Sequence, residues 1–223
     1  MTRLLFIGTH GPDDPTRATF PFHFANGAIE AGFEAKVFLA GDATYLMKDD
    51  EWGSMFTVHR ASTDADWHQA TALLYDYVEW VRGWTDIDPV AEQPQLHAEL
   101  AAIAGHYDTD DAALYLATWG AIAVGAVAIR ARPDRSAELK RMYVRPIARG
   151  SGIADRLIDA AVAGATERGC HTVWLETVRG VMDPAVAVYQ RTGFVESSTR
   201  TPMLNVDGAI VMERIVSVAI RCA

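Results

Sequence analysis

The residues Arg149, Gly150, Ser151 and Gly152 follow a predicted strand and precede a predicted helix. Pro146 ends the strand, because a proline has no N–H to donate to a sheet. The first amides of a helix have no partner within it, and they carry the positive end of its dipole. Glycine lets the backbone approach a ligand closely, and arginine adds a positive charge. The turn therefore has the residue types that bind a phosphate or a pyrophosphate.

The same turn has simpler interpretations. Its glycines could serve only the geometry of a tight turn. The turn does not match the Gly-x-Gly-x-x-Gly pattern of dinucleotide-binding folds, because Asp155 stands where the third glycine would be. The strand before it also belongs to a run of strands rather than to a strand-helix-strand unit. The surrounding elements have to decide between these interpretations.

Hydrophobic periodicity predicts the elements around the turn. The helix after it has an apolar stripe at every fourth position, formed by Ile153, Leu157, Ala161 and Ala165. Short connections join the three strands before the turn, so these should form an antiparallel meander.

From position 56 to position 215 the predicted order is strand, helix, helix, three strands, helix, strand, helix and two strands. Thr63 or Asp64 could cap the first helix, which contains Trp67 and Val81. The other segments are, in order, FTVHRAS, PQLHAELAAIAGHY, DAALYLATW, GAIAVGAVAIRA, AELKRMYVR, the helix after the turn, HTVWLET, DPAVAVYQRTG, FVES and AIVMERI.

The first 50 residues form a separate pattern. RLLFIG and EAKVFLAG are predicted strands, and apolar residues recur at helical spacing between positions 17 and 31. This strand-helix-strand unit should be right-handed with parallel strands. Two strands and one helix cannot bury both faces of a sheet, so the unit must pack on the rest of the chain or on another subunit.

Composition limits the classes of partner. The chain has 223 residues, 50% of them hydrophobic, and a net charge of -9, which argues against a nucleic-acid partner. It has two cysteines, Cys170 and Cys222, and no CxxC or HExxH pattern, so we expect neither a disulfide framework nor a metal site. No apolar run is long enough for a membrane span or a signal peptide. We therefore expect a cytoplasmic protein without a membrane partner.

The second, larger part of the chain resembles the GNAT superfamily of acyltransferases. The family's motif A, Arg/Gln-x-x-Gly-x-Gly/Ala, matches Arg149, Gly152 and Ala154. VWLET, MDPAVAVYQRTGF and the ME of IVMERI match later elements at the family's spacing. The resemblance covers about residues 56–215. It implies an α/β (α+β) fold with a mixed central sheet and flanking helices, here with the strand-helix-strand unit added, and acetyl-CoA as the co-substrate.

The resemblance also implies which groups bind acetyl-CoA. The strand before the turn would pair with the pantetheine arm through backbone groups near Met142, Tyr143 and Val144. This strand and the strand containing 175–177 should diverge and leave a slot for the thioester. The residues whose amides would bind the pyrophosphate are Arg149, Gly150, Ser151, Gly152, Ile153 and Ala154.

Two residues are predicted to be catalytic. An amine can attack a thioester only after it loses a proton, and the departing thiolate is helped by an acid. Tyr189 stands at the family's acid position, although it could simply pack. Glu138 is our first candidate for the base, although it could instead form an ion pair with a neighbour, Lys140 or Arg141. Glu176 is the second candidate, and a chain of water molecules without a dedicated base is a third possibility.

Some residues depart from the family pattern or have two interpretations. Met182 stands where many members have an asparagine, so the asparagine's contact with the cofactor arm is in doubt. Tyr77, Trp80 and Trp84 belong to the early helices, which form the acceptor side in the family. They could line a substrate site, but an aromatic stripe on a helix is more often part of the core.

The N-terminal unit resembles the first half of a DsrE-like domain, a fold of sulfur-relay proteins. The resemblance lies in LLFIGTHGPDDPTRATFPFHFANGAIEAGFEAKVFLAGDATYLM. The half in which some members have a reactive cysteine is missing, and no cysteine precedes Cys170, so sulfur transfer is disfavoured.

We therefore predict three parts: a truncated DsrE-like unit at 1–54, a GNAT acetyltransferase domain at 55–216 and a tail at 217–223. The predicted function is transfer of an acetyl group from acetyl-CoA to the amine of a small-molecule acceptor by direct attack on the thioester. The alternative is a non-catalytic module that binds acyl-CoA or a protein partner. A homodimer is possible, because the N-terminal unit should expose apolar surface.

Overall fold

The computed structural model describes residues 2–47, 55–84 and 95–216. The N-terminal unit contains β1 (Arg3–Gly8), α1 (Pro15–Glu30), β2 (Glu34–Leu39) and the 3₁₀ helix η1 (Gly41–Met47). β1 and β2 pair in parallel, as predicted. The predicted boundary at 54/55 and the tail at 217–223 lie at or beyond the edges of the described residues.

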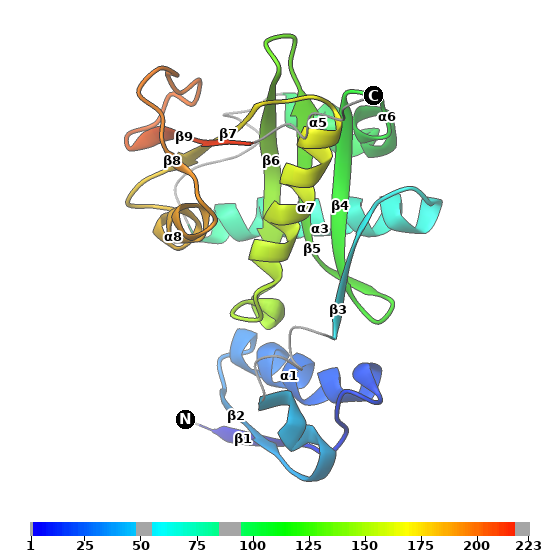
Figure 1. Cartoon of the computed structure of the whole chain (residues 1–223). Helices are drawn as coiled ribbons and strands as arrows, with labels where there is room; N and C mark the ends of the chain where they lie inside the picture. The colour runs from blue at the N-terminus through cyan, green and yellow to red at the C-terminus, as the bar shows by residue number, and fades with distance from the viewer. Residues whose placement is uncertain (1, 48–54, 85–94, 217–223) are drawn as a thin grey trace.

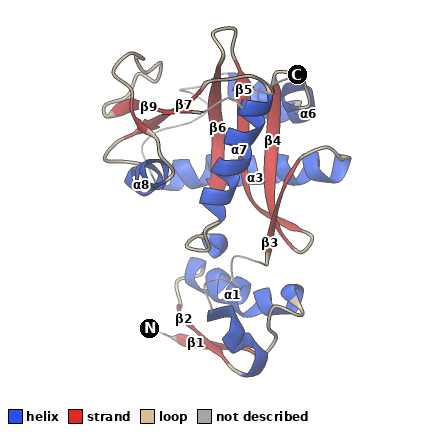
Figure 2. Cartoon of the chain, in the orientation of Figure 1, coloured by secondary structure: helices blue, strands red, loops and turns tan. Residues whose placement is uncertain are grey.

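A seven-stranded mixed sheet forms the larger part of the molecule, in the order β3-β4-β5-β6-β7-β9-β8 (Figures 1 and 2). β4, β5 and β6 form the predicted antiparallel meander. β6 and β7 are parallel neighbours, whereas the other pairs of this sheet are antiparallel. The strands are β3 (Phe56–Arg60), β4 (Ala112–Trp119), β5 (Ile122–Ala131), β6 (Ser136–Val144), β7 (Thr172–Val178), β8 (Val195–Glu196) and β9 (Ala209–Ile215).

Helices cover both faces of this sheet. Figure 1 shows α7 across one face and α3 across the other. The predicted stripe of α7 is completely buried, in a core shared with the sheet and α8. A second core lies between the sheet and α3, α5 and α6. The helices are α3 (Asp64–Trp84), α5 (Gln95–Ala101), α6 (Ile103–Tyr107), the 3₁₀ helix η2 (Pro146–Ala148), α7 (Ile153–Glu167) and α8 (Asp183–Arg191).

The start of α3 is a reciprocal cap. Thr63 Oγ1 accepts a hydrogen bond from the amide of Asp66, and the Asp66 carboxylate accepts from the amides of Ser62 and Thr63. The pattern Thr-x-x-Asp is the short form of a capping box, so Thr63 and not Asp64 is the cap.

The segment predicted as one helix at 94–107 forms two helices over its described residues, 95–107. The backbone of Ala102 leaves the helical region, with φ at −142°, and divides the segment into α5 and α6. Ile103 and Tyr107 of α6 are buried in the core against α3 and β4. Leu96 and Leu100 of α5 are buried in the same core, and the spacing of all four residues would equally suit one continuous helix, so periodicity cannot reveal the break.

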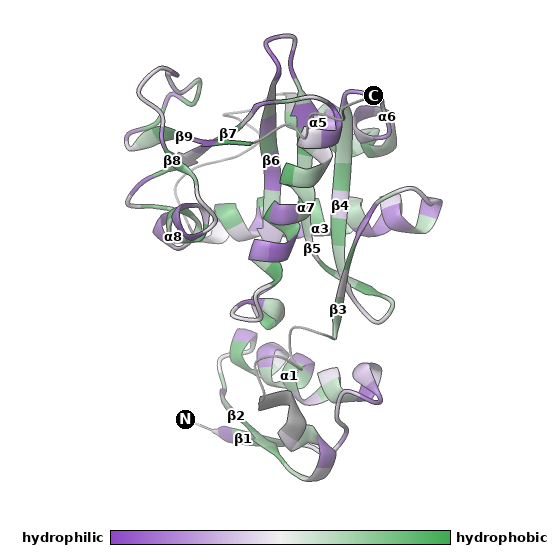
Figure 3. Cartoon of the chain, in the orientation of Figure 1, coloured by the Kyte–Doolittle hydropathy of each residue, from purple (hydrophilic) through white to green (hydrophobic). Residues whose placement is uncertain are grey.

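Apolar residues, green in Figure 3, recur along the strands and helices of the N-terminal unit. Many of their side chains are exposed. α1 covers one face of the β1–β2 pair with Ala18, Pro21 and Ala25. The opposite face exposes side chains of both strands. On α1, Phe20 and Phe24 are also exposed, and the ring of Phe24 stacks on Phe6 of β1 with 6.3 Å between centroids. The exposed large apolar side chains of this unit are Leu5, Ile7, Phe20, Phe24, Ile29, Phe33 and Phe38.

No helix in the described part of the chain is both long and apolar enough to span a membrane.

Candidate active site

β6 and β7 separate in the middle of the sheet. They pair only from Ser136 opposite Thr172 to Glu138 opposite Trp174. Beyond this point β6 runs on to Val144 without a described backbone pair in β7. The predicted slot between the two strands is therefore present.

A β-bulge lies on β6 just beyond the last pair. The register between β5 and β6 shifts by one residue between Lys140 and Tyr143, and Arg141 adopts a left-handed backbone with φ at +57°. A positive φ is unfavourable for arginine, and a bulge bends its strand and increases its twist. The bulge thus accounts for the direction in which β6 leaves β7.

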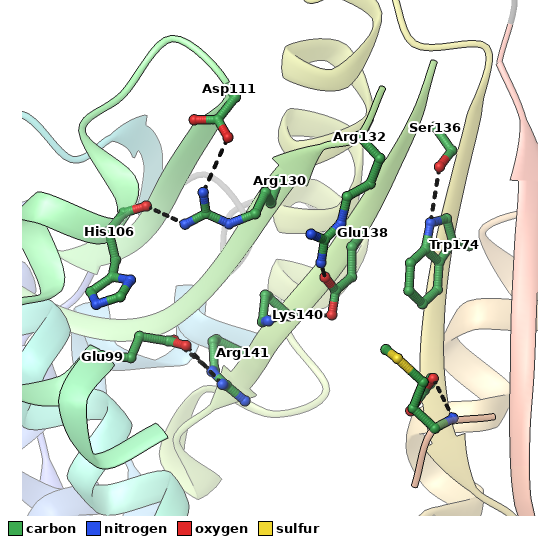
Figure 4. Close-up of polar contacts among 12 residues, drawn as sticks. Glu99, His106, Asp111, Arg130, Arg132, Ser136, Glu138, Lys140, Arg141 and Trp174 are labelled. Carbon is green, nitrogen blue, oxygen red and sulfur yellow. Dashed lines mark hydrogen bonds and ion pairs between the residues drawn. The ribbon is translucent and has the colours of Figure 1, made fainter. Parts of the chain in front are cut away.

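A buried ion pair holds the bulge in place. Glu99 of α5 accepts two hydrogen bonds from Arg141, from Nε at 2.7 Å and from Nη2 at 2.8 Å (Figure 4). The hydroxyl of Tyr107 donates to the same carboxylate at 2.5 Å. Burial alone would raise the pKa of Glu99, but the hydrogen bonds and charge of Arg141 outweigh it and lower that pKa. Loss of either partner would leave the other charge buried without compensation, so each residue of this pair depends on the other.

A cavity of about 920 Å³ occupies the slot. This volume is in the upper part of the usual range for small-molecule sites. Its walls come from α3, β6, β7, the turn before α7, α8 and the loop before β9. Of the residues predicted to bind acetyl-CoA or to act in catalysis, those that line it are Met142, Tyr143, Val144, Arg149, Gly150, Gly152, Ile153, Ala154 and Tyr189.

The turn at one end of the cavity has the backbone that its glycines permit. Gly150 and Gly152 have φ angles of +79° and +78°, a region that other residues rarely adopt. A side chain at either position would meet no other atom within 4 Å, so backbone conformation and not crowding requires glycine. Ser151 is buried, and its hydroxyl donates to the carbonyl of Ala148 at 2.6 Å. Ser151 therefore stabilises the turn through its side chain, and only its amide remains a candidate ligand.

The N-terminus of α7 faces the cavity with its first amides. Asp155, in the first turn, also lines the cavity, and a carboxylate there would repel an anion. Arg191 of α8 offsets that charge with two hydrogen bonds to Asp155, at 3.1 and 3.0 Å. The positive helix end and Arg149 therefore remain available for an anionic ligand.

Tyr189 of α8 lies in the wall of the cavity. The side chain is buried, and its ring packs on Phe194 at 5.9 Å between centroids. Burial raises the pKa of the Tyr189 hydroxyl well above its usual value, and the neighbouring Tyr77 contributes in the same direction. The hydroxyl is thus protonated at neutral pH, as a proton donor must be.

Glu138 and Glu176 differ in their surroundings. Glu138 forms ion pairs with Arg132 and with Lys140, the latter at 3.2 Å, and it does not line the cavity (Figure 4). Glu176 does line the cavity. Its two oxygens accept hydrogen bonds from the amides of Met203, at 2.8 Å, and Leu204, at 3.2 Å. The ion pair of Glu138 with Lys140, one of the two alternatives for this residue, is therefore present.

Sequence reasoning did not find the loop before β9 as part of the site. Leu204 and Val206 of this loop line the cavity, and Glu176 holds the loop there. It also missed the Glu99–Arg141 pair. Neither feature has a local sequence signal, because each joins segments at least 27 residues apart. Tyr77 and Trp80 line the cavity, whereas the side chain of Trp84 lies outside the described part.

Comparisons with known proteins agree with this geometry. Residues 74–194 match the model of the acetyltransferase (GNAT) family. No curated protein matches the chain. A Klebsiella pneumoniae protein assigned to the acyl-CoA N-acyltransferases is 26% identical, with a TM-score of 0.54, over 73% of this chain and 98% of that one.

Two more distant structures share the fold. One is an acetyltransferase of the GNAT family from Staphylococcus aureus, with 18% identity and a TM-score of 0.59 over 73% of this chain and 99% of that one. The other is a Salmonella typhimurium protein assigned as an acetyltransferase and solved with acetyl-CoA, with 14% identity and a TM-score of 0.55 over 76% and 97%. The family match covers more than half of this sequence and includes both the turn before α7 and Tyr189. The chain therefore belongs to the acetyltransferase (GNAT) family and is an acetyltransferase.

Proposed function

We propose that the chain transfers the acetyl group of acetyl-CoA directly to the amine of a small-molecule acceptor. The observation that supports this most strongly is the opening between β6 and β7, with the glycine turn and the N-terminus of α7 lining it and a buried tyrosine in its wall. Acetyl-CoA fits this order of groups, because its pyrophosphate and its thioester lie at opposite ends of an extended arm.

The cofactor would lie along the free edge of β6. Its pantetheine amides would pair with backbone groups near Met142, Tyr143 and Val144, as a strand would. Its pyrophosphate would accept hydrogen bonds from the amides of the turn and of the first turn of α7. The residues that provide these amides are Arg149, Gly150, Ser151 and Gly152 of the turn and Ile153 and Ala154 at the start of α7.

Catalysis would then need two proton transfers. The neutral amine attacks the thioester carbon and forms a tetrahedral intermediate, and the C–S bond breaks as the intermediate collapses. Tyr189 gives its proton to the departing sulfur. The proton of the attacking amine passes to a carboxylate or to water. Of the two carboxylates, Glu176 borders the cavity, whereas a proton moving to Glu138 would have to cross by way of water.

The first experiment is a thiol-release assay with acetyl-CoA over a panel of amines, amino acids and polyamines. Tyr189→Phe should lower kcat by about 100-fold or more, because it removes the proton donor and keeps the ring. Tyr75→Phe is the matched control, since Tyr75 is exposed on α3. If Tyr189→Phe keeps full kcat on the identified acceptor, Tyr189 is not the acid.

Two further variants separate the base candidates. A direct base at Glu176 predicts a lower kcat in Glu176→Gln. A base at Glu138 predicts the larger loss in Glu138→Gln. A chain of water molecules predicts little change of kcat in either variant. Acetyl-CoA binding without turnover on any acceptor would support the alternative, a non-catalytic acyl-CoA-binding module.

We also propose that the N-terminal unit, at 1–54, is a truncated DsrE-like module that assembles the chain into a homodimer, with the acetyltransferase domain at 55–216. The support is the uncovered face of β1 and β2, where Leu5, Ile7 and Phe38 are exposed. Parallel sheets are normally covered on both faces. Light scattering after size exclusion should give a dimer for the whole chain and a monomer for Phe38→Asp. A monomeric wild type would contradict this proposal.

The proposal includes a cytoplasmic location, which fractionation of cells would test.

A further inference from the structure

The side chain of Trp80 connects α3 with the turn before α7. Its indole ring lies under the guanidinium of Arg149, with Cζ of Arg149 at 4.8 Å from the ring centroid. Both residues line the cavity, although they lie on opposite sides of the meander in the sequence. Tryptophan is the most favourable ring for a cation–π contact, and arginine is the cation that forms such contacts more often in proteins.

Two more contacts hold this pair in place. Nε of Arg149 donates a hydrogen bond to the carbonyl of Val144 at 3.0 Å. The ring of Trp80 also packs near that of Tyr143, with 6.2 Å between centroids. The guanidinium is thus oriented both by the end of β6 and by the face of the indole. The side chain of an exposed arginine would otherwise sample many rotamers.

We propose that Trp80 is a positioning residue for acetyl-CoA, acting through Arg149. The indole holds the guanidinium at the end of β6, in the same cavity that the first residues of α7 line. The pyrophosphate binds there in the proposed function, on which this inference rests. Arginine has several N–H donors, so the bond to Val144 leaves others for the ligand. Ordering the side chain before binding reduces the entropy that binding would otherwise cost.

A purely structural role of Trp80 makes a different prediction. Trp80 also packs against the core between α3 and the sheet. If that packing were its whole contribution, its removal would affect binding equally whether or not residue 149 is an arginine. A double-mutant cycle separates the two roles, because coupling between two side chains appears as non-additivity.

The test measures the Kd of acetyl-CoA and of ADP by calorimetry. ADP carries a pyrophosphate without the pantetheine arm. The chains are the wild type, Trp80→Leu, Trp80→Phe, Arg149→Met and the double variant Trp80→Leu with Arg149→Met. Tyr75→Leu is the control for a change elsewhere on α3, and Trp80→Phe guards against misfolding because it keeps an aromatic face.

Trp80→Leu should weaken both ligands by roughly threefold to tenfold, Trp80→Phe by less, and Tyr75→Leu should have no effect. In the Arg149→Met background, Trp80→Leu should cause no further loss. An equal loss in both backgrounds, or a loss for acetyl-CoA but not for ADP, would overturn the inference and leave the proposed function intact. A wild type that binds neither ligand would overturn both.

Discussion

The two parts of this chain are built from similar strands and helices, but their sheets are covered to different degrees. In the acetyltransferase domain, helices cover both faces of the sheet, and Leu114 on β4 is 0% exposed. In the N-terminal unit, one helix covers one face of two strands, and Phe38 on β2 is 57% exposed. Both parts have apolar strands, so the difference lies in the number of layers. A regular element buries its apolar residues only where another element packs on it.

Charged side chains show the same contrast. Glu99 and Arg141 form a nearly completely buried pair inside the acetyltransferase domain. Glu34 and Arg3 form a pair at a similar distance, 2.7 Å, across β1 and β2, but in contact with water. The two pairs have similar distances, but loss of one partner costs more free energy in the buried pair. The charge that remains there has no water to replace its partner.

The largest expected effect tests this contrast directly. Glu99→Ala should lower the free energy of unfolding by about 3–5 kcal/mol, because Arg141 is left buried without its carboxylate. Glu34→Ala, at the exposed pair, should cost less than about 1 kcal/mol. Urea denaturation of both variants measures the difference. Equal losses of unfolding free energy would mean that the buried pair stabilises the fold no more than the exposed pair does.

A second pair of substitutions compares the two apolar surfaces. Leu114→Ala should cost about 2–5 kcal/mol, because it leaves a cavity in a closed core. Phe38→Ala should change the stability of a monomer by less than about 0.5 kcal/mol, because its side chain is mostly in water. The midpoint of thermal unfolding, followed at several protein concentrations, distinguishes the cases. A concentration-dependent loss in Phe38→Ala would show that a second copy covers this face.

The smallest effect concerns pH and the start of α3. Burial would raise the pKa of Asp66, but hydrogen bonds from His59 and from the amides of Ser62 and Thr63 lower it well below its usual value. The folded pKa is thus lower than the unfolded one. The contribution of Asp66 is therefore complete above about pH 4 and is lost as the pH falls further.

Asp66→Asn should cost about 1 kcal/mol at pH 7 and less at pH 3, so the two unfolding curves should converge in acid. Urea midpoints of both chains from pH 3 to pH 7 measure this. A constant difference across that range would rule out the charge of Asp66 as the cause.

Local pattern determined much of this protein. The stripe of α7, the strands of the meander and the parallel pair at the N-terminus follow from periodicity, because a residue's side of a helix or strand depends only on its spacing. The glycines at 150 and 152 likewise indicate a backbone with positive φ, which few other residues adopt. Together with the resemblance to the GNAT family, these features were enough to predict the fold.

Only the tertiary structure decided how the site opens and what holds it open. The bulge at Arg141 is held by Glu99, the loop with Leu204 is held by Glu176, and Arg149 is held by Trp80. Each pair joins segments far apart in the sequence, and spacing contains no information about such partners. The break at Ala102 also has no local signal, because the buried residues on its two sides keep the spacing of one continuous helix.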